Sequence, residues 1–344
     1  MKSKRLAALL LSGVMAASML TGCGGMNKDA VVATFDETEI KLGIANFAAR
    51  MQQASADDFY VAYFGEDVWN SDLYGNGTTM QDSMKDSVMQ SLFDMYTLQA
   101  HMVEYDVELT DAERAAITLA ATDFMAANDK EALDALGAEQ EIVEEYLTLL
   151  TIQDKMYDAI IATVDTNVSD EEANTGAYSY VRVAKDSYTD AEGNVLYYTE
   201  EELTELAETV DAFATEAQED TLETAAETYG YTVSTGTFTA DDVNVNETVL
   251  TTLQGLEEGE VSGVIDTETG YYIVRLDAKT DAEATELTRQ SIISERESTL
   301  YTETLSGWEE EHEWIIKEKV WDKVTFDNLF TTIPETEAVE ATEQ

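Results

Sequence analysis

The first half of the chain carries a helical hydrophobic pattern. Between residues 80 and 105 the apolar positions recur three or four residues apart, which predicts a long amphipathic helix. Thr110 and Glu113 predict a capping box at the start of the next helix. A third helical pattern covers residues 139–164. The stripe of the first helix consists of Met84, Val88, Leu92, Met95 and Met102, widened by Phe93, Tyr96 and Ala100.

Methionines on such a stripe serve either ordinary core packing or an adaptable surface that binds partner chains. We expect core packing here. Ahead of the stripe, residues 30–43 alternate between apolar and polar positions and predict a strand or hairpin, followed by a helix from Lys41 to Ala54. The aromatic segment 57–79 then reads as irregular, with Gly75 and Gly77 marking a loop.

The pattern changes near residues 166–175, where we predict a domain boundary. Residues 177–184 alternate as a strand, residues 200–229 form a helical pattern, and residues 231–239 read as a strand again. A short helix near 246–256 and the last strands within 255–276 complete the order. Strands and helices in this succession predict an α+β domain with a small antiparallel sheet.

A late helical pattern covers residues 282–321. Neither this helix nor the early ones cover their apolar faces alone, so we expect the two sets to pack together. A final strand within 322–330 is predicted next. The predicted domains are a signal peptide (1–22), a tether (23–30), an N-terminal helical region (31–172), an inserted α+β domain (173–280), a C-terminal segment that completes the helical region (281–330) and an acidic disordered tail (331–344).

The N-terminus has the pattern of a bacterial lipoprotein signal. Lys2, Lys4 and Arg5 precede an apolar run that is short for a membrane span and ends in the sequence LTGC. This lipobox predicts lipidation of Cys23 and a membrane anchor on the extracytoplasmic face of a bacterial cell membrane. The alternative is a soluble secreted protein in which the cysteine is accidental.

Composition narrows the range of functions. The chain has 344 residues, 44% of them hydrophobic, and a net charge of −52. That charge leaves no basic face for a phosphate backbone, so we expect no nucleic-acid partner. Cys23 is the single cysteine, and His101 and His312 lack the neighbours that metal ligands need, so we predict no metal and no cofactor. We expect His101 to be a packing or surface residue and His312 to be solvated or salt-bridged.

Residues 255–276, with the sequence GLEEGEVSGVIDTETGYYIVRL, resemble the terminal motif of parvulin-type peptidyl-prolyl isomerase domains. Residues 178–185 resemble the first strand of that family, and residues 221–231 its helix before the active-site loop. The flanking segments are similar to the split helical chaperone region of PrsA-like and SurA-like extracytoplasmic foldases. The resemblance implies binding of unfolded or newly secreted chains and rotation about X–Pro bonds, and it leaves a homodimer open.

The resemblance also implies site residues. Tyr180 and Tyr272 match the positions of two family histidines, Thr269 matches a hydroxyl position, and Thr232 matches a Cys or Asp position. The aromatic and methionine positions that grip proline fall near two valines, Val245 and Val249. With both imidazoles replaced, three functions stay open: a foldase with isomerase activity, a non-catalytic holdase with an inactive parvulin-like domain, and a solute-binding lipoprotein. The last would need repeated βαβ units, which the pattern does not show.

Overall fold

The structure is a computed structural model that describes residues 14–18, 26–189 and 193–333. The chain divides into two compact units, of which unit 1 comprises residues 1–164 and 298–344 and unit 2 comprises residues 165–297. Unit 1 is therefore built from both ends of the chain, with unit 2 inserted between them. The boundary on the C-terminal side falls within helix α11 (Ala282–Glu309).

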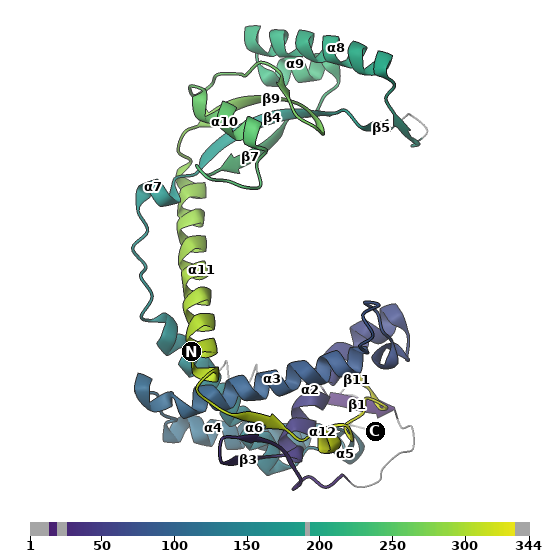
Figure 1. Cartoon of the computed structure of the whole chain (residues 1–344), viewed down its shortest axis with the longest axis vertical. Coiled ribbons are helices and arrows are strands. Elements are labelled where there is room, and N and C mark those ends of the chain that lie inside the picture. Colours follow the sequence, from purple (N-terminus) through teal and green to yellow (C-terminus); the bar gives the residue numbers. More distant parts are fainter. Residues whose placement is uncertain (1–13, 19–25, 190–192, 334–344) are drawn as a thin grey trace. The chain divides into compact units, whose positions relative to one another are not determined.

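Unit 1 is mainly helical. Its long helices pack on one another, and a three-stranded antiparallel sheet of order β10-β2-β3 lies with them (Figure 1). The other strands form a separate antiparallel pair. The helices are α2 (Leu42–Phe64), α3 (Met80–Ala100), α4 (Asp111–Ala127), α5 (Lys130–Leu136), α6 (Gln140–Ile161) and α12 (Glu318–Trp321), with 3-10 turns η1 (Val68–Asn70) and η2 (Met102–Tyr105). The strands are β2 (Val31–Phe35), β3 (Thr38–Lys41), β10 (Trp314–Ile316) and the pair β1 (Val14–Ser18) and β11 (Leu329–Ile333).

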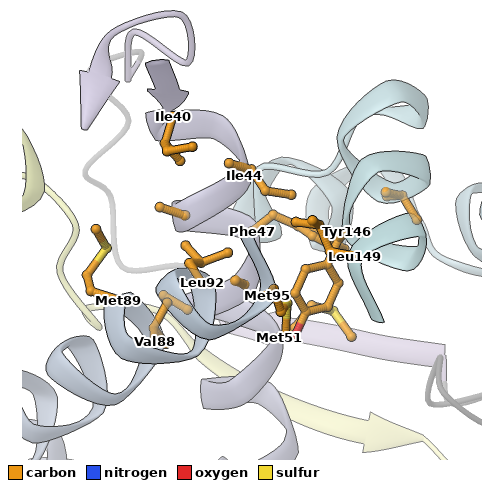
Figure 2. Close-up of a cluster of buried hydrophobic side chains, with 14 of the residues drawn as sticks. Ile40, Ile44, Phe47, Met51, Val88, Met89, Leu92, Met95, Tyr146 and Leu149 are labelled. Carbon is orange, nitrogen blue, oxygen red and sulfur yellow. The ribbon is translucent and has the colours of Figure 1, made fainter. Parts of the chain in front are cut away.

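Unit 1 has a single core cluster, which combines residues between Val32 and Ile160 with residues between Leu305 and Phe330. Phe47 is fully buried in this core and makes edge-on ring contacts with Tyr146 (Figure 2) and with Phe124. The methionine stripe packs into the same core, so its expected packing role is confirmed. Leu305 and the side chains around it join this core from the late helix, which confirms that the early and late helices pack together.

Several sequence-level expectations for unit 1 are confirmed in detail. The Thr110 side chain accepts a hydrogen bond from the Glu113 backbone N–H, and the Glu113 carboxylate accepts one from the Thr110 backbone N–H at 2.8 Å, which completes the capping box. The segment from residue 31 is the hairpin β2–β3, which turns at Asp36 with a positive φ of 49°. The helix that follows runs ten residues beyond its predicted end, to Phe64.

The structure describes only part of the predicted signal peptide and of the predicted tail. Part of the predicted signal peptide forms β1, which pairs antiparallel with β11. Cys23, the other signal residues and residues 334–344 lie outside the described residues. Strand β11 continues to Ile333, three residues into the predicted tail. Among the helices that the structure describes, none is long and apolar enough to cross a membrane.

A buried carboxylate ties the C-terminal strand to α2. Asp57 accepts hydrogen bonds from Trp69 Nε1 at 2.6 Å, from Gln53 Nε2 at 3.2 Å and from the backbone N–H of Phe330 at 2.7 Å. Burial raises the pKa of Asp57 to about 6, while these three donors act in the opposite direction. The bonds hold β11 against the middle of α2, which explains why distant segments share one core.

Unit 2 has an α+β fold, as the sequence predicts. A four-stranded antiparallel sheet of order β7-β4-β9-β8 is covered by α8 and α9 on one face and by α10 on the other (Figure 1). A small hairpin extends from the end of β4. The strands are β4 (Gly176–Ala184), β5 (Ser187–Thr189), β6 (Val195–Tyr197), β7 (Ser234–Phe238), β8 (Ile265–Asp266) and β9 (Gly270–Ala278), and the helices are α7 (Asp170–Ala173), α8 (Glu200–Glu219), α9 (Leu222–Tyr229) and α10 (Glu247–Gly255).

Candidate functional site

A row of aromatic rings lies on the α10-facing side of the sheet in unit 2. Because side chains alternate along a strand, Tyr178 and Tyr180 of β4 share one face, and Tyr272 of β9 joins them. The Tyr180 ring lies 6.1 Å from the Tyr272 ring and 5.4 Å from the Tyr178 ring, measured between centroids. Phe238 of β7 extends the row, 6.0 Å from Tyr178. The structure thus brings together the two tyrosines that the sequence singled out.

Two glycines make room for this row. A Cβ on Gly236, which pairs with Tyr178, would lie 2.8 Å from ring atoms of that tyrosine. A Cβ on Gly176 would lie 2.5 Å from atoms of the Phe238 ring. Any side chain at either position would displace a ring, so the glycines set the spacing of the row.

The tyrosines of the row are half-buried and pack against the core on this face of the sheet. Burial raises the pKa of Tyr178, and the nearby tyrosines and Asp242 add to this shift. The guanidinium of Arg182 lies 6.0 Å from the centroid of the Tyr272 ring. The face therefore offers apolar walls, hydroxyl donors and one cation, but it holds no imidazole, because the chain's histidines are at positions 101 and 312.

The remaining residues singled out from the sequence take different positions. Val249 is 2% exposed and belongs to the core beneath the row, while Val245 is partly buried at its edge. Thr232 is exposed and lies two residues before Ser234, which pairs with Tyr180.

The turn before β9 is closed by a hydroxyl that the sequence did not single out. Thr267 is 8% exposed, and its hydroxyl donates to the carbonyl of Gly270 at 2.6 Å. Thr269 is exposed, and its carbonyl accepts hydrogen bonds from the Arg182 side chain at 3.1 Å and from the Lys185 N–H at 3.3 Å. The backbone of Thr269 thereby fixes the end of β4 beside Tyr272. Tyr178 was missed in the same way, although its period-two spacing from Tyr180 was a usable signal.

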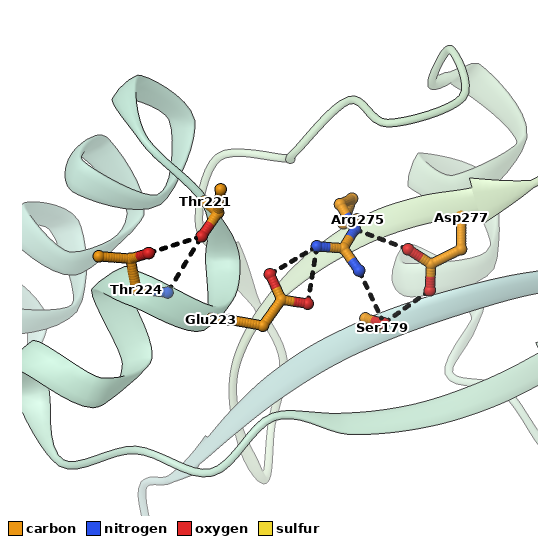
Figure 3. Close-up of polar contacts among 6 residues, drawn as sticks. All are labelled: Ser179, Thr221, Glu223, Thr224, Arg275 and Asp277. Atoms are coloured by element: carbon orange, nitrogen blue, oxygen red, sulfur yellow. Dashed lines mark hydrogen bonds and ion pairs between the residues drawn. The ribbon is translucent and has the colours of Figure 1, made fainter.

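The opposite face of the sheet carries a closed polar network (Figure 3). Arg275 contacts both carboxylate oxygens of Glu223, at 2.8 and 2.7 Å, and its Nε donates to Asp277 at 2.6 Å. Ser179 accepts from Arg275 at 3.2 Å and donates to Asp277 at 2.6 Å. The bonds from Arg275 lower the pKa of Glu223. Because the network joins the first turn of α9 to the sheet and its groups satisfy one another, we interpret it as structural.

The chain's two histidines meet in unit 1, which the sequence did not predict. His101 Nε2 lies 3.1 Å from His312 Nε2, so one ring donates and the other accepts. Their other nitrogens contact Glu104 and Asp36, at 2.7 and 2.8 Å. Trp308 stacks on His101 with centroids 4.3 Å apart. The packing role of His101 and the salt-bridged role of His312 are confirmed, and no group of His, Cys, Asp or Glu in the described ranges forms a metal site.

The segment that carries the aromatic row matches a known protein family. Residues 168–289 match the family model described as the PPIC-type PPIase domain. The chain contains a PPIC-type domain. The resemblance to parvulin-type domains that the terminal motif predicted is therefore confirmed. The matched segment covers the whole sheet of unit 2 with both its faces, and it ends within α11.

Two curated relatives align with a longer part of the chain than the PPIC-type domain. A foldase protein PrsA from Clostridium botulinum strain 657 is 25% identical over 194 residues, and one from strain Langeland is 23% identical over 193 residues. Each match covers 52% of this chain and 55% of the relative, so the chain spans about half the length of the curated relatives it matches.

Among solved structures, a foldase protein PrsA from Streptococcus pneumoniae is 18% identical. That match covers 74% of this chain and 97% of the other, with a TM-score of 0.30. The PPIC-type match and the geometry of unit 2 are what support the functional proposal.

Proposed function

We propose that the protein is a membrane-anchored extracytoplasmic foldase that binds newly secreted chains through unit 1 and catalyses peptidyl-prolyl isomerisation in unit 2. The observation that carries the proposal is the row of Tyr178, Tyr180 and Tyr272, which lies on one face of a PPIC-type domain. Two of these tyrosines occupy the positions where the family resemblance implies histidines. The unfolded chains bound by such a foldase are its partners.

The proposed reaction is a bond rotation with a high barrier. Rotation about an X–Pro bond has a barrier of roughly 20 kcal/mol and needs no nucleophile and no cofactor. A site lowers the barrier by binding the twisted amide more tightly than the planar one. Ring walls exclude water from the proline, and a tyrosine hydroxyl can donate to an amide group whose conjugation is lost as it twists. Each tenfold acceleration requires about 1.4 kcal/mol of such differential binding.

A second candidate function is a non-catalytic holdase, and two observations favour it. Unit 2 contains no histidine, and Val249 is buried at a position where the resemblance implies a residue that grips proline. In this case the PPIC-type domain would serve as a scaffold, and unit 1 alone would bind clients.

A pair of assays separates the two functions. The first measures refolding of a protein whose slow phase is limited by proline isomerisation, and the second measures suppression of aggregation for a client without proline. A foldase with isomerase activity accelerates the first and suppresses aggregation in the second, whereas a holdase acts only in the second. Activity in neither assay would contradict both functions.

We propose further that Cys23 carries the lipid anchor. The support is the apolar run and the LTGC sequence, since two acyl chains suffice to hold a protein stably on a membrane. Cys23→Ser should move the protein from the membrane fraction to the soluble fraction. Ser18→Ala, a change of similar size in the same predicted signal, is the matched control and should leave the protein in the membrane fraction. Membrane retention of Cys23→Ser would contradict the anchor.

A further inference from the structure

The C-terminal end of α2 displays a cluster of exposed aromatic rings, which we call the aromatic tip and define as Phe59, Tyr60, Tyr63 and Phe64. Phe59, Tyr63 and Phe64 are 57%, 73% and 52% exposed. The rings are contiguous, with centroids 4.7 Å apart for Phe59 and Tyr63, 5.5 Å for Phe59 and Tyr60, and 6.1 Å for Tyr60 and Phe64. A contiguous apolar patch of this kind is a common mark of an interaction site.

The tip rests on a rigid base. Tyr60 contacts the ring of Trp69 with centroids 5.6 Å apart, and Trp69 is 1% exposed. Trp69 in turn donates to the buried carboxylate of Asp57. The backbone that carries the exposed rings is therefore fixed before any partner binds, which lowers the entropic cost of binding.

The stretch of sequence that contains the tip carries charged residues of one sign only. From residue 51 to residue 84 the sequence has no Lys, Arg or His, but it has six acidic residues. The last turn of α2 holds no basic residue, so the negative end of the helix dipole is uncompensated by its own side chains. The acidic residues of this stretch are Asp57, Asp58, Glu66, Asp67, Asp72 and Asp82.

We propose that the aromatic tip binds stretches of unfolded polypeptide in which Lys or Arg alternates with apolar residues. This inference rests on the proposed foldase function and names the class of segment that unit 1 recognises. Cations bind to aromatic faces, most strongly where a negative potential surrounds the rings, and apolar side chains gain from burial against the same rings. Arg and Lys also complement the carboxylates and the helix end.

The same charges disfavour other occupants. An anionic membrane surface would be repelled by the acidic residues around the rings. A second copy of the chain would present the same acidic patch in a symmetric contact, and the net charge of −52 would oppose that contact. Cationic, partly apolar segments are the partner for which the ring faces and the charges both act favourably.

The test uses the full chain and two labelled, unstructured peptides. One peptide alternates Lys with Leu and Phe, and the other has Glu in place of each Lys. We expect the Lys peptide to bind at least tenfold more tightly than the Glu peptide, and this preference to weaken as salt is raised. Phe59→Ser with Tyr63→Ser should weaken binding of the Lys peptide roughly tenfold, since two exposed ring contacts are lost.

Matched controls keep the result interpretable. Leu119→Ser replaces a 61% exposed apolar residue on α4 and should leave peptide binding unchanged. Tryptophan fluorescence reports whether the tip variant remains folded. Equal binding of both peptides, unchanged affinity in the tip variant, a preference for anionic vesicles, or loss of binding on dilution of a dimer would each overturn the proposal. If the tip variant still suppresses aggregation as the parent does, the tip proposal fails while the foldase function stands; if the parent itself suppresses none, the foldase function fails.

Discussion

The two units differ in how the sequence supplies their cores. Unit 1 has one continuous core that needs residues from both ends of the chain, whereas unit 2 is built from one uninterrupted segment with a small cluster on each face of its sheet. Unit 2 can therefore form as soon as its own segment is available, while unit 1 must wait for α11, β10 and β11. We therefore expect that a core substitution in one unit lowers the free energy of unfolding of that unit and leaves that of the other unchanged.

The largest expected effect comes from removing the central ring of unit 1. Phe47→Ala should lower the free energy of unfolding of unit 1 by about 3–5 kcal/mol, because the ring is fully buried and leaves a cavity. Unit 2 should keep its stability. All four tryptophans, at positions 69, 308, 314 and 321, lie in unit 1, so denaturant unfolding followed by tryptophan fluorescence reports on this unit alone.

The reciprocal variant is Phe213→Ala, which empties the core on the α8 side of the sheet in unit 2. It should destabilise unit 2 by a similar amount, measured by hydrogen exchange of β4 and β9, and leave the fluorescence transition in place. A single transition that moves with both variants would show that the units unfold together and would break the comparison.

A smaller effect is expected from the polar network behind the sheet. Arg275→Leu should lower the stability of unit 2 by about 0.5–1 kcal/mol, because it breaks the ion pairs with Glu223 and Asp277, whose exposed carboxylates are then solvated by water. Hydrogen exchange of α9 and β9 measures the loss. Arg289→Leu, which removes an arginine bonded to Asp170 outside this network, is the matched control for loss of charge and should leave exchange of α9 unchanged.

The smallest expected effect is a pH dependence confined to unit 1. Burial and the neighbouring Asp94 carboxyl raise the pKa of Glu309 to about 7, and burial raises that of Asp57 to about 6. A raised pKa in the folded state means that the protonated form is favoured by folding. The stabilisation of unit 1 by these two protonated carboxyl groups is thus complete below about pH 4, and it is lost as the pH rises through 6 and 7. Unit 1 should be less stable at pH 8 than at pH 5.

Glu309→Gln tests the source of this dependence. The variant removes one titrating group, so the fall in stability between pH 6 and 8 should become shallower, as measured by fluorescence-monitored unfolding. Glu310→Gln, at the exposed neighbouring position, should keep the slope of the parent. An unchanged slope in Glu309→Gln would assign the dependence to another group.

The elements that the sequence predicted well are those whose hydrophobic period is long and regular. The helix α3 follows from spacing and the start of α4 from its capping box, whereas Tyr180 and Tyr272 were singled out through the family resemblance and Tyr178 was missed. Helix α2 was predicted too short because aromatic residues on several sides hid its period, although Phe59 and Tyr63 are one helical turn apart.

Other features depend on contacts between distant segments. His101 and His312 are 211 residues apart, and each is unremarkable in its own sequence neighbourhood. Similarly, the role of Thr267 in the turn before β9 depends on which of several nearby hydroxyls is turned inward. Neither the hydrophobic period nor local propensity predicts which residues become partners, because the partners are set by the tertiary fold.

The most direct measurement of the central claim, that tyrosine hydroxyls serve the isomerase site, is proline-limited refolding with Tyr180→Phe and Tyr272→Phe combined. We predict that the parent accelerates refolding with a rate that is nearly constant between pH 6 and 8, because unit 2 has no imidazole, and that the double variant loses the acceleration. Tyr229→Phe with Tyr231→Phe, a ring pair packed on the opposite face, should refold the client as the parent does. Acceleration that survives the first double change, or a parent without acceleration, would contradict the claim.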